Sequence, residues 1–243
     1  MNSKNNKTAL VVGVIAGTPF DTQLGLNQLS RLGLQAITGY SISQDPNSQT
    51  LLQANKSLLE LHVAKAIDFL LLKHVSCIII YCNSISSAID IKKIKAFYKN
   101  IKFITTNNIY EKIKVSSNNI GLITANSQCA GNIEKIILKN NPNGQVIGIG
   151  LLPIVKAIES GSTAKEIIKK YDLVRLCEFL TRNDCTEIIL GCTHFENFYD
   201  ELEKEIKQSN IGTTLLPIHN QVISLFTEIT HINPKSSKEI AHC

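Results

Sequence analysis

Two short segments carry the same arrangement of residues, and that arrangement suits thiol chemistry. In Cys77–Ser84 and in Glu187–His194, an apolar run of the kind that forms strands ends on a cysteine, Cys82 or Cys192. Two polar residues follow, and a helical pattern then begins. A strand that passes directly into a helix leaves its last residue at the carboxyl end of a sheet, where open α/β sheets bind their ligands. The start of a helix also favours the thiolate form of a cysteine. We therefore expect two thiols, one from each half of the chain, to face each other across a cleft.

Two opposed thiols allow three kinds of chemistry: disulfide exchange, nucleophilic catalysis by one of them, or proton transfer on both faces of a carbon atom. A nucleophilic cysteine usually needs a histidine nearby, and His194 follows Cys192 by two residues. The corresponding position after Cys82 holds Ser84. A symmetric pair of thiols whose neighbouring residues differ in this way favours inversion of configuration at the Cα of a substrate. Groups expected to bind the substrate carboxylate and stabilise the carbanion are the backbone N–H groups at the two helix starts and the side chains of Asn83, Ser84, Thr18 and Thr193.

Strands and helices alternate along the whole chain, which is typical of parallel βαβ units. The expected strands are Ala9–Ala16, Gln35–Ser43, Cys77–Ile80, Lys102–Thr106, Asn119–Thr124, Val146–Ile149, Glu187–Leu190 and Thr213–Ile218. Asp21 or Thr22 is expected to cap the first helix, Gln44–Thr50 to form a loop, and Leu51–Leu72 to form one helix or two. We expect single helices over Ser86–Phe97, Ala164–Thr181 and Phe195–Gln208.

The predicted fold class is α/β, with two pseudo-symmetric, doubly wound domains that each hold a mostly parallel sheet of about four strands. The predicted N-terminal domain is 1–108 plus 219–243, and the C-terminal domain is 109–218. The active site is expected at the domain interface. Residues after Ile232 have the composition of a frayed tail.

Composition excludes several classes of function. The chain has 243 residues, a formal charge of +5 and no Trp, and its lysines are spread through helical stretches, so a nucleic-acid partner is not expected. No apolar run is long enough for a membrane span, and the polar Met1–Thr8 does not resemble a signal peptide. We therefore expect a cytoplasmic protein whose seven cysteines are reduced, without structural zinc. The dinucleotide fingerprint is absent, so no nicotinamide cofactor is expected.

The two cysteine motifs resemble the paired motifs of the aspartate/glutamate racemase family. Val12–Pro19 is similar to the first-strand loop of that family, and Gly121–Thr124 is similar to the opening strand of its second domain. The likeness covers essentially the whole chain. It implies a pyridoxal-independent racemase with no cofactor, two catalytic cysteines and pseudo-symmetric α/β domains, acting on a small amino acid and commonly forming a homodimer.

Departures from the family pattern leave the substrate open between aspartate and glutamate. Ala16-Gly17 is closer to the aspartate type, whereas His194 matches the glutamate type; Asp45–Thr50 offers Gln49 where an Arg is usual. The family's threonine after the second-domain strand is displaced here. The candidate catalytic residues are Cys82, Cys192 and His194. The candidate substrate-binding residues are Gly17, Thr18, Gln49, Asn83, Ser84, Thr124, Asn126 and Thr193.

Other activities on the same fold stay open at this point: maleate isomerisation, arylmalonate decarboxylation and hydantoin racemisation. A non-catalytic member that binds an amino acid as a sensor is a further alternative. A dithiol redox role would require the two sulfurs to approach within bonding distance.

Overall fold

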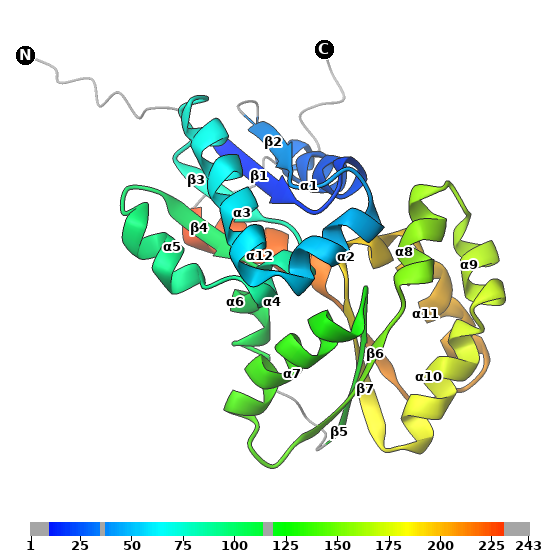
Figure 1. The fold of residues 1–243 in the computed structure, drawn as a ribbon. Helices are drawn as coiled ribbons and strands as arrows, with labels where there is room; N and C mark the ends of the chain where they lie inside the picture. Colours follow the sequence, from blue (N-terminus) through cyan, green and yellow to red (C-terminus); the bar gives the residue numbers. More distant parts are fainter. Residues whose placement is uncertain (1–9, 35–36, 114–118, 231–243) are drawn as a thin grey trace, which may run out of the picture.

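The computed structural model describes residues 10–34, 37–113 and 119–230, which form two α/β halves around two parallel sheets (Figure 1). Each sheet has four strands, in the orders β2-β1-β3-β4 and β6-β5-β7-β8. The second sheet therefore repeats the strand order of the first, which confirms the predicted fold class. The predicted tail after Ile232 and the segment Met1–Thr8 lie outside the described residues.

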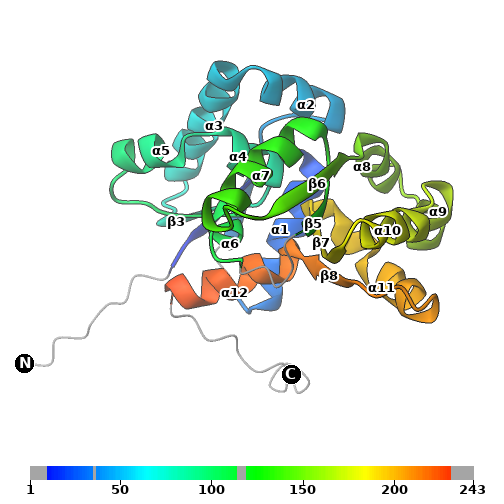
Figure 2. The same ribbon diagram turned by 90° about the horizontal axis from the view of Figure 1, so that it is seen from below.

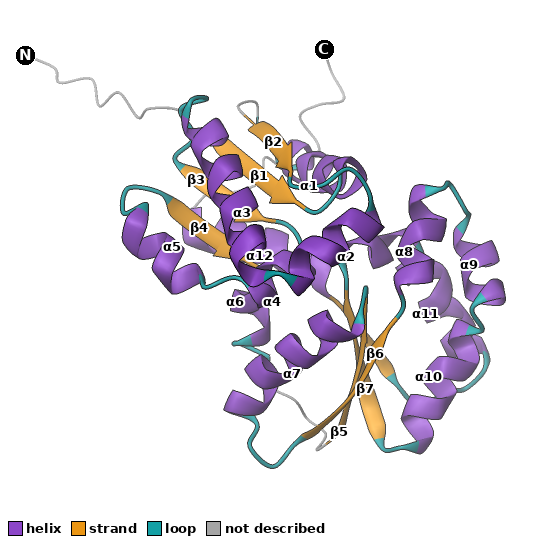
Figure 3. Cartoon of the chain, in the orientation of Figure 1, coloured by secondary structure: helices purple, strands orange, loops and turns teal. Residues whose placement is uncertain are grey.

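The first half contains the first sheet and six helices (Figure 3). The strands are β1 (Val12–Ala16), β2 (Ile37–Ser41), β3 (Cys77–Ile80) and β4 (Lys102–Thr105). The helices are α1 (Pro19–Arg31), α2 (Pro46–Ala54), α3 (Lys56–Leu71), α4 (Asn83–Ala88), α5 (Ile91–Phe97) and α6 (Asn107–Tyr110). Successive residues of β1 face opposite sides: Gly13 lies against Leu70 of α3, and Val14 lies against Gly25 of α1. Helices α1 and α3 therefore cover opposite faces of this sheet.

The second half repeats this plan. Its strands are β5 (Asn119–Thr124), β6 (Gln145–Gly150), β7 (Cys185–Gly191) and β8 (Thr214–Pro217). Its helices are α7 (Ser127–Asn140), α8 (Leu152–Glu159), α9 (Ala164–Lys170), α10 (Leu173–Arg182), the 3₁₀ helix η1 (Thr193–Asn197), α11 (Tyr199–Gln208) and α12 (Ile218–Thr230). Helix α7 contacts β5 and β6, whereas α10 contacts β7 from the other side in Figure 1.

Strand order fixes where a ligand can bind. In each sheet the first strand pairs with the second on one side and with the third on the other, so the direction of winding reverses between β1 and β3 and between β5 and β7. Parallel sheets bind ligands at the carboxyl ends of the strands that flank such a reversal. Cys82 follows β3 and Cys192 follows β7, so both thiols lie at these points.

Helix α12 links the two halves. It begins where β8 ends and runs back towards the first half (Figure 2). It contacts β4 and α6 on one side and β7 and η1 on the other. Its buried Val222 and Phe226 belong to a hydrophobic cluster that also contains Val12 of β1 and Ile189 of β7. One hydrophobic cluster therefore spans both halves, and each half also has a cluster of its own. The domain limits 1–108 plus 219–243 and 109–218 stay a prediction. None of the helices in the described part of the chain is both long and apolar enough to cross a bilayer.

Two helices begin earlier than the sequence predicted, and proline is the physical reason in both cases. Helix α1 is capped by Thr18 rather than by Asp21 or Thr22, and the Thr18 Oγ1 accepts from the backbone N–H of Asp21 at 3.2 Å. Helix α2 begins at Pro46, inside the predicted loop, with Asp45 as its cap. Proline at the first helical position loses no hydrogen bond and has the φ that a helix needs. Asp21 therefore lies within the first turn of α1.

Several predicted long helices are broken by polar caps. Asn55 separates α2 from α3, and Asp90, which accepts from the N–H groups of Lys92 and Lys93, separates α4 from α5. Asp172 separates α9 from α10 with a φ of 50°, a left-handed conformation that Asp tolerates better than most residues. The predicted helix Phe195–Gln208 is instead the 3₁₀ turn η1 followed by α11. The break at Asn55 agrees with the prediction of one helix or two over Leu51–Leu72. Apolar periodicity continues across the other three breaks, which the sequence did not reveal.

Gly150, at the end of β6, makes a close backbone contact that the sequence did not reveal. A Cβ atom at this position would overlap the backbone of Asn126 and Ser127, where α7 begins. We expect Gly150→Ala to lower the free energy of unfolding by about 1–3 kcal/mol, measured by urea denaturation. The control is Gly131→Ala in α7, where a Cβ meets no atom within 4 Å, and where stability should be unchanged or rise by up to about 1 kcal/mol. Equal midpoints for the two variants would contradict the clash.

Candidate active site

The two cysteines predicted to act together line one cavity between the halves. Cys82 precedes the first residue of α4, Cys192 precedes η1, and each thiol residue is 6% exposed. The residues around the cavity are Gly17, Thr18, Asp21, Pro46, Gln49, Cys82, Asn83, Ser84, Ala125, Val155, Cys192, Thr193 and His194. These come from the carboxyl ends of β1, β3, β5 and β7, from the first turns of the helices that follow, including α1, and from α2 and α8.

The cavity is closed in this structure. Its volume of ≈ 10 Å³ is about that needed for one water molecule. An amino acid is several times larger, so the side chains around the thiols must move apart before a substrate can enter. A closed, dry site strengthens electrostatic interactions among the groups that line it.

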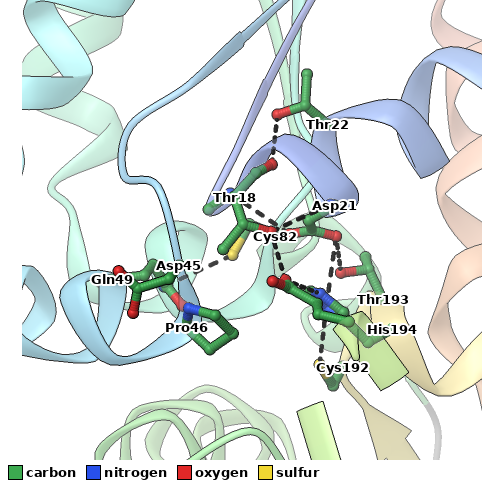
Figure 4. A network of polar contacts seen from close by, with 12 residues as sticks. Thr18, Asp21, Thr22, Asp45, Pro46, Gln49, Cys82, Cys192, Thr193 and His194 are labelled. Carbon is green, nitrogen blue, oxygen red and sulfur yellow. Dashed lines mark hydrogen bonds and ion pairs between the residues drawn. The ribbon is translucent and has the colours of Figure 1, made fainter. Parts of the chain in front are cut away.

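A chain of polar contacts connects Cys192 with two carboxylates, and Cys82 lies beside this chain (Figure 4). The Nδ1 of His194 lies 3.7 Å from the Cys192 Sγ and 3.7 Å from Asp21 Oδ1. Its Nε2 lies 2.8 Å from Glu159 Oε1. His194 therefore joins Cys192 to one carboxylate from α1 and to another from α8. The ring of Phe20 stacks on the imidazole at a centroid distance of 5.6 Å and fixes its plane.

The two carboxylates are themselves held by hydroxyl groups. Thr193 Oγ1 donates to Asp21 Oδ1 at 2.6 Å, and Thr18 Oγ1 donates to Glu159 Oε1 at 2.6 Å. Each of these bonds joins one half of the chain to the other. Asp21 also lies close enough to the Cys82 thiol for each group to affect the pKa of the other. Each cysteine thus has its own acid–base neighbour: Asp21 for Cys82 and His194 for Cys192.

Burial and the nearby charges set the protonation of these groups. Burial by itself works to lower the pKa of His194, but Asp21, Cys192 and Glu159 outweigh it and hold this pKa well above 6.5. Burial raises the pKa of Asp21 above 3.8. Burial, and then the charge of Asp21, raise the pKa of Cys82 well above 9.0. The sequence predicted that the helix start would favour a thiolate at Cys82; in the closed site, burial outweighs the N–H groups of α4, and this cysteine is a thiol.

One buried amide is positioned to receive a ligand. The Oδ1 of Asn83 accepts from the Tyr110 hydroxyl at 2.7 Å, which leaves its Nδ2 as a donor. That Nδ2 is buried and has no partner among the described residues. A buried unpaired donor is costly, so it favours an acceptor such as a carboxylate oxygen. On the other side of Cys82, Gln49 Nε2 lies 3.8 Å from the sulfur, and the Gln49 side chain packs against Gly17.

Most of the sequence-predicted site residues meet at this cavity. Two do not line it: Thr124, whose Oγ1 donates to the carbonyl of Asn126 at 2.8 Å, and Asn126, which caps α7 by accepting from the N–H of Cys129 at 2.9 Å. Sequence reasoning missed Asp21, Pro46, Ala125, Val155 and Glu159. The pattern Thr18-Pro19-Phe20-Asp21 marked a helix start, but only the fold shows that Asp21 is buried beside both motifs.

Comparisons with known proteins agree with this geometry. No family model matches the chain. A glutamate racemase of Clostridium botulinum is 27% identical over 158 residues, or 61% of this chain and 60% of that protein. A glutamate racemase of Neisseria meningitidis is 27% identical over 148 residues, or 58% of this chain and 53% of that protein. The chain thus matches less than two thirds of the length of these relatives.

Solved structures with the same fold match over nearly the whole chain. A glutamate racemase of Francisella tularensis in complex with D-glutamate superposes with a TM-score of 0.68 at 20% identity, covering 94% of this chain and 84% of that one. An aspartate racemase of Picrophilus torridus superposes with a TM-score of 0.55 at 12% identity, covering 93% of this chain and 96% of that one. These likenesses establish the two-half fold.

Proposed function

We propose that this chain is a member of the aspartate/glutamate racemase family, which it resembles in sequence and in fold, and that it interconverts the L and D forms of an acidic amino acid without a cofactor. The observation that carries the proposal is that Cys82 and Cys192, from equivalent positions in the two halves, line one cavity. Two thiols that approach one carbon from opposite sides suit inversion better than they suit a single nucleophilic attack.

In the proposed reaction, one cysteine acts as thiolate and removes the proton from Cα. The electron pair of the broken C–H bond stays on the substrate as a carbanion. The opposite cysteine, as thiol, donates its proton to the other face, so the configuration inverts and the thiol and thiolate exchange places. Substrate of the opposite handedness uses the same two groups in reverse order.

Each thiol needs a group that can take up its proton before the reaction. For Cys82 we assign this role to Asp21, because its raised pKa makes the carboxylate a better proton acceptor than an ordinary Asp. For Cys192 we assign it to His194, which Glu159 orients through the 2.8 Å contact. The unpaired Nδ2 of Asn83 supports a role in binding the substrate carboxylate. Ser84 and Thr193, on the two motifs, would assist it, and Gln49 would meet the substrate next to Cys82.

Choice of substrate, assembly and location are parts of the same proposal. Among the residues that line the cavity, all of them described, His194 alone can carry a positive charge. A second carboxylate on the substrate would therefore be bound by neutral donors such as Gln49. Aspartate and glutamate both fit that description. The proposed homodimer rests on the family resemblance, and the proposed cytoplasmic location rests on the lack of a long apolar run and on the polar segment Met1–Thr8.

The test is turnover in D₂O with enantiopure L- and D-aspartate and L- and D-glutamate. We expect deuterium at Cα by NMR together with formation of the opposite enantiomer by chiral chromatography, for at least one of the two amino acids. Binding without exchange at any pH between about 6 and 9 would indicate a sensor instead. Products other than the enantiomer would indicate an isomerase or decarboxylase of the same fold.

A further inference from the structure

A second crevice lies between the two halves, beside the catalytic cavity. Its volume is ≈ 540 Å³, within the range of small-molecule sites. It is lined by Gln53, Lys56, Ser87, Ala88, Ile89, Gln128, Gly131, Asn132 and Lys135. These residues belong to the end of α2, the start of α3, the end of α4 and one face of α7, which lie together in Figure 1. Both halves therefore contribute to it.

The charged side chains that line this crevice are both cations. Lys56 approaches from the first half and Lys135 from the second, and no carboxylate is among the lining residues. The acid that faces Lys56 is Glu60, whose Oε1 lies 3.9 Å from the Lys56 ammonium and whose Oε2 lies 3.9 Å from that of Lys93. One carboxylate shared between two ammonium groups does not neutralise both of them, so the net charge around the crevice is positive. A positive net charge favours an anionic ligand.

One lining residue also has an unused donor. Gln53 is 6% exposed, and its Oε1 accepts from the Nδ2 of Asn126 at 2.9 Å. The orientation of both amides is fixed, because Asn126 Oδ1 must accept from the N–H of Cys129. The Nε2 of Gln53 is therefore a donor, and it is buried with no partner among the described residues. A ligand oxygen would supply the acceptor that this group lacks.

We propose that this crevice binds a small molecule through a carboxylate or phosphate group, held by Gln53, Lys56 and Lys135. The anion would bridge α2 and α3 of the first half and α7 of the second. Its binding would therefore change how closely the two halves approach each other. The route to the catalytic site is short: Gln53 lies one helical turn after Gln49, which contacts Cys82. The anion can be the acidic amino acid on its way to the thiols, which rests on the proposed function, or a separate phosphate-bearing effector, which does not.

Two changes remove the proposed contacts. Lys56→Ala/Lys135→Ala deletes both cations, and Gln53→Glu keeps an oxygen for Asn126 while replacing the unpaired donor by a negative oxygen. The matched control is Lys92→Ala/Lys139→Ala, which removes two exposed lysines outside the crevice. Circular dichroism melting checks that all variants fold.

Calorimetric titration with inorganic phosphate in phosphate-free buffer is the first measurement. We expect saturable binding to the wild type and the control, weakened at least about tenfold in the other two variants. This readout does not depend on racemisation, so it stands even if the proposed function fails. The second measurement is the KM for the acidic amino acid. A rise of similar size in Lys56→Ala/Lys135→Ala with unchanged kcat assigns the crevice to the substrate path. If neither phosphate affinity nor KM differs between these variants and the control, the proposal is wrong.

Discussion

Replacing Cys82 by serine, or Cys192 by serine, should abolish racemisation, and each variant should still exchange the Cα proton of one enantiomer, a different one in each case. A positioned acid–base group contributes about 10²–10⁴-fold to a rate, and a serine hydroxyl is far too weak an acid to replace a thiol. Each variant keeps one functional base. That base can still remove the Cα proton of the one enantiomer whose C–H bond faces it. In D₂O we therefore expect each variant to incorporate residual deuterium into one enantiomer without inverting it, and the two variants to choose opposite enantiomers.

The matched control is Cys129→Ala. Cys129 is another buried free cysteine and interacts with Ser87, but it does not line the cavity. It should retain racemisation within a few-fold of the wild type. Deuterium incorporation into the same enantiomer by both serine variants, or a wild-type rate in either, would contradict a two-base mechanism.

The fold and the thiol pair were accessible from the sequence because their signals are local and repeated. A strand, a cysteine, two polar residues and a helix occur twice, and strand-to-helix connections always leave such residues at one edge of a parallel sheet. The repeated strand order of the two sheets follows from the same alternation. These features depend on neighbours in the chain, and sequence patterns report neighbours well.

The acid–base partners of the thiols were not accessible in this way. Asp21 binds Thr193, and Glu159 binds Thr18, across sequence separations of 172 and 141 residues. Asp21 was read as a helix cap because an acid in the first turn of a helix usually has that role. Glu159, at the end of a mostly apolar helix, has no local pattern that distinguishes it from a solvated residue. Only the packing of α1 and α8 against η1 shows what these acids do.

Glutamine in place of Glu159 should lower kcat and narrow the pH range of activity. The substitution keeps an oxygen that can accept from Thr18, but it removes a negative charge 2.8 Å from the Nε2 of His194. Asp21 raises the pKa of His194 most, and the hydrogen bond with Glu159 adds to this effect. Without the Glu159 carboxylate, the pKa of His194 should therefore fall. A group whose pKa is raised in the enzyme stays protonated up to that higher pKa. When His194 takes up the proton of Cys192, a thiolate–imidazolium pair forms. In the wild type, activity that depends on this pair therefore persists above pH 6.5 and declines as pH rises through the raised pKa of His194. In Glu159→Gln the same decline should begin at lower pH.

A full pH profile of kcat/KM for the wild type, Glu159→Gln, His194→Gln and the double variant measures this effect. We expect His194→Gln to reduce kcat by roughly 10²-fold, the lower end of the range for a positioned acid–base group. The same variant should also lose the decline of activity at high pH that Glu159→Gln moves to lower pH. Because Glu159 acts through His194, the double variant should be no worse than His194→Gln, which is the non-additivity expected for residues in one network. Glu178→Gln, an exposed acid paired with Arg182, is the control and should leave the profile unchanged. Additive losses in the double variant, or an unshifted limb in Glu159→Gln, would show that Glu159 does not act through the histidine.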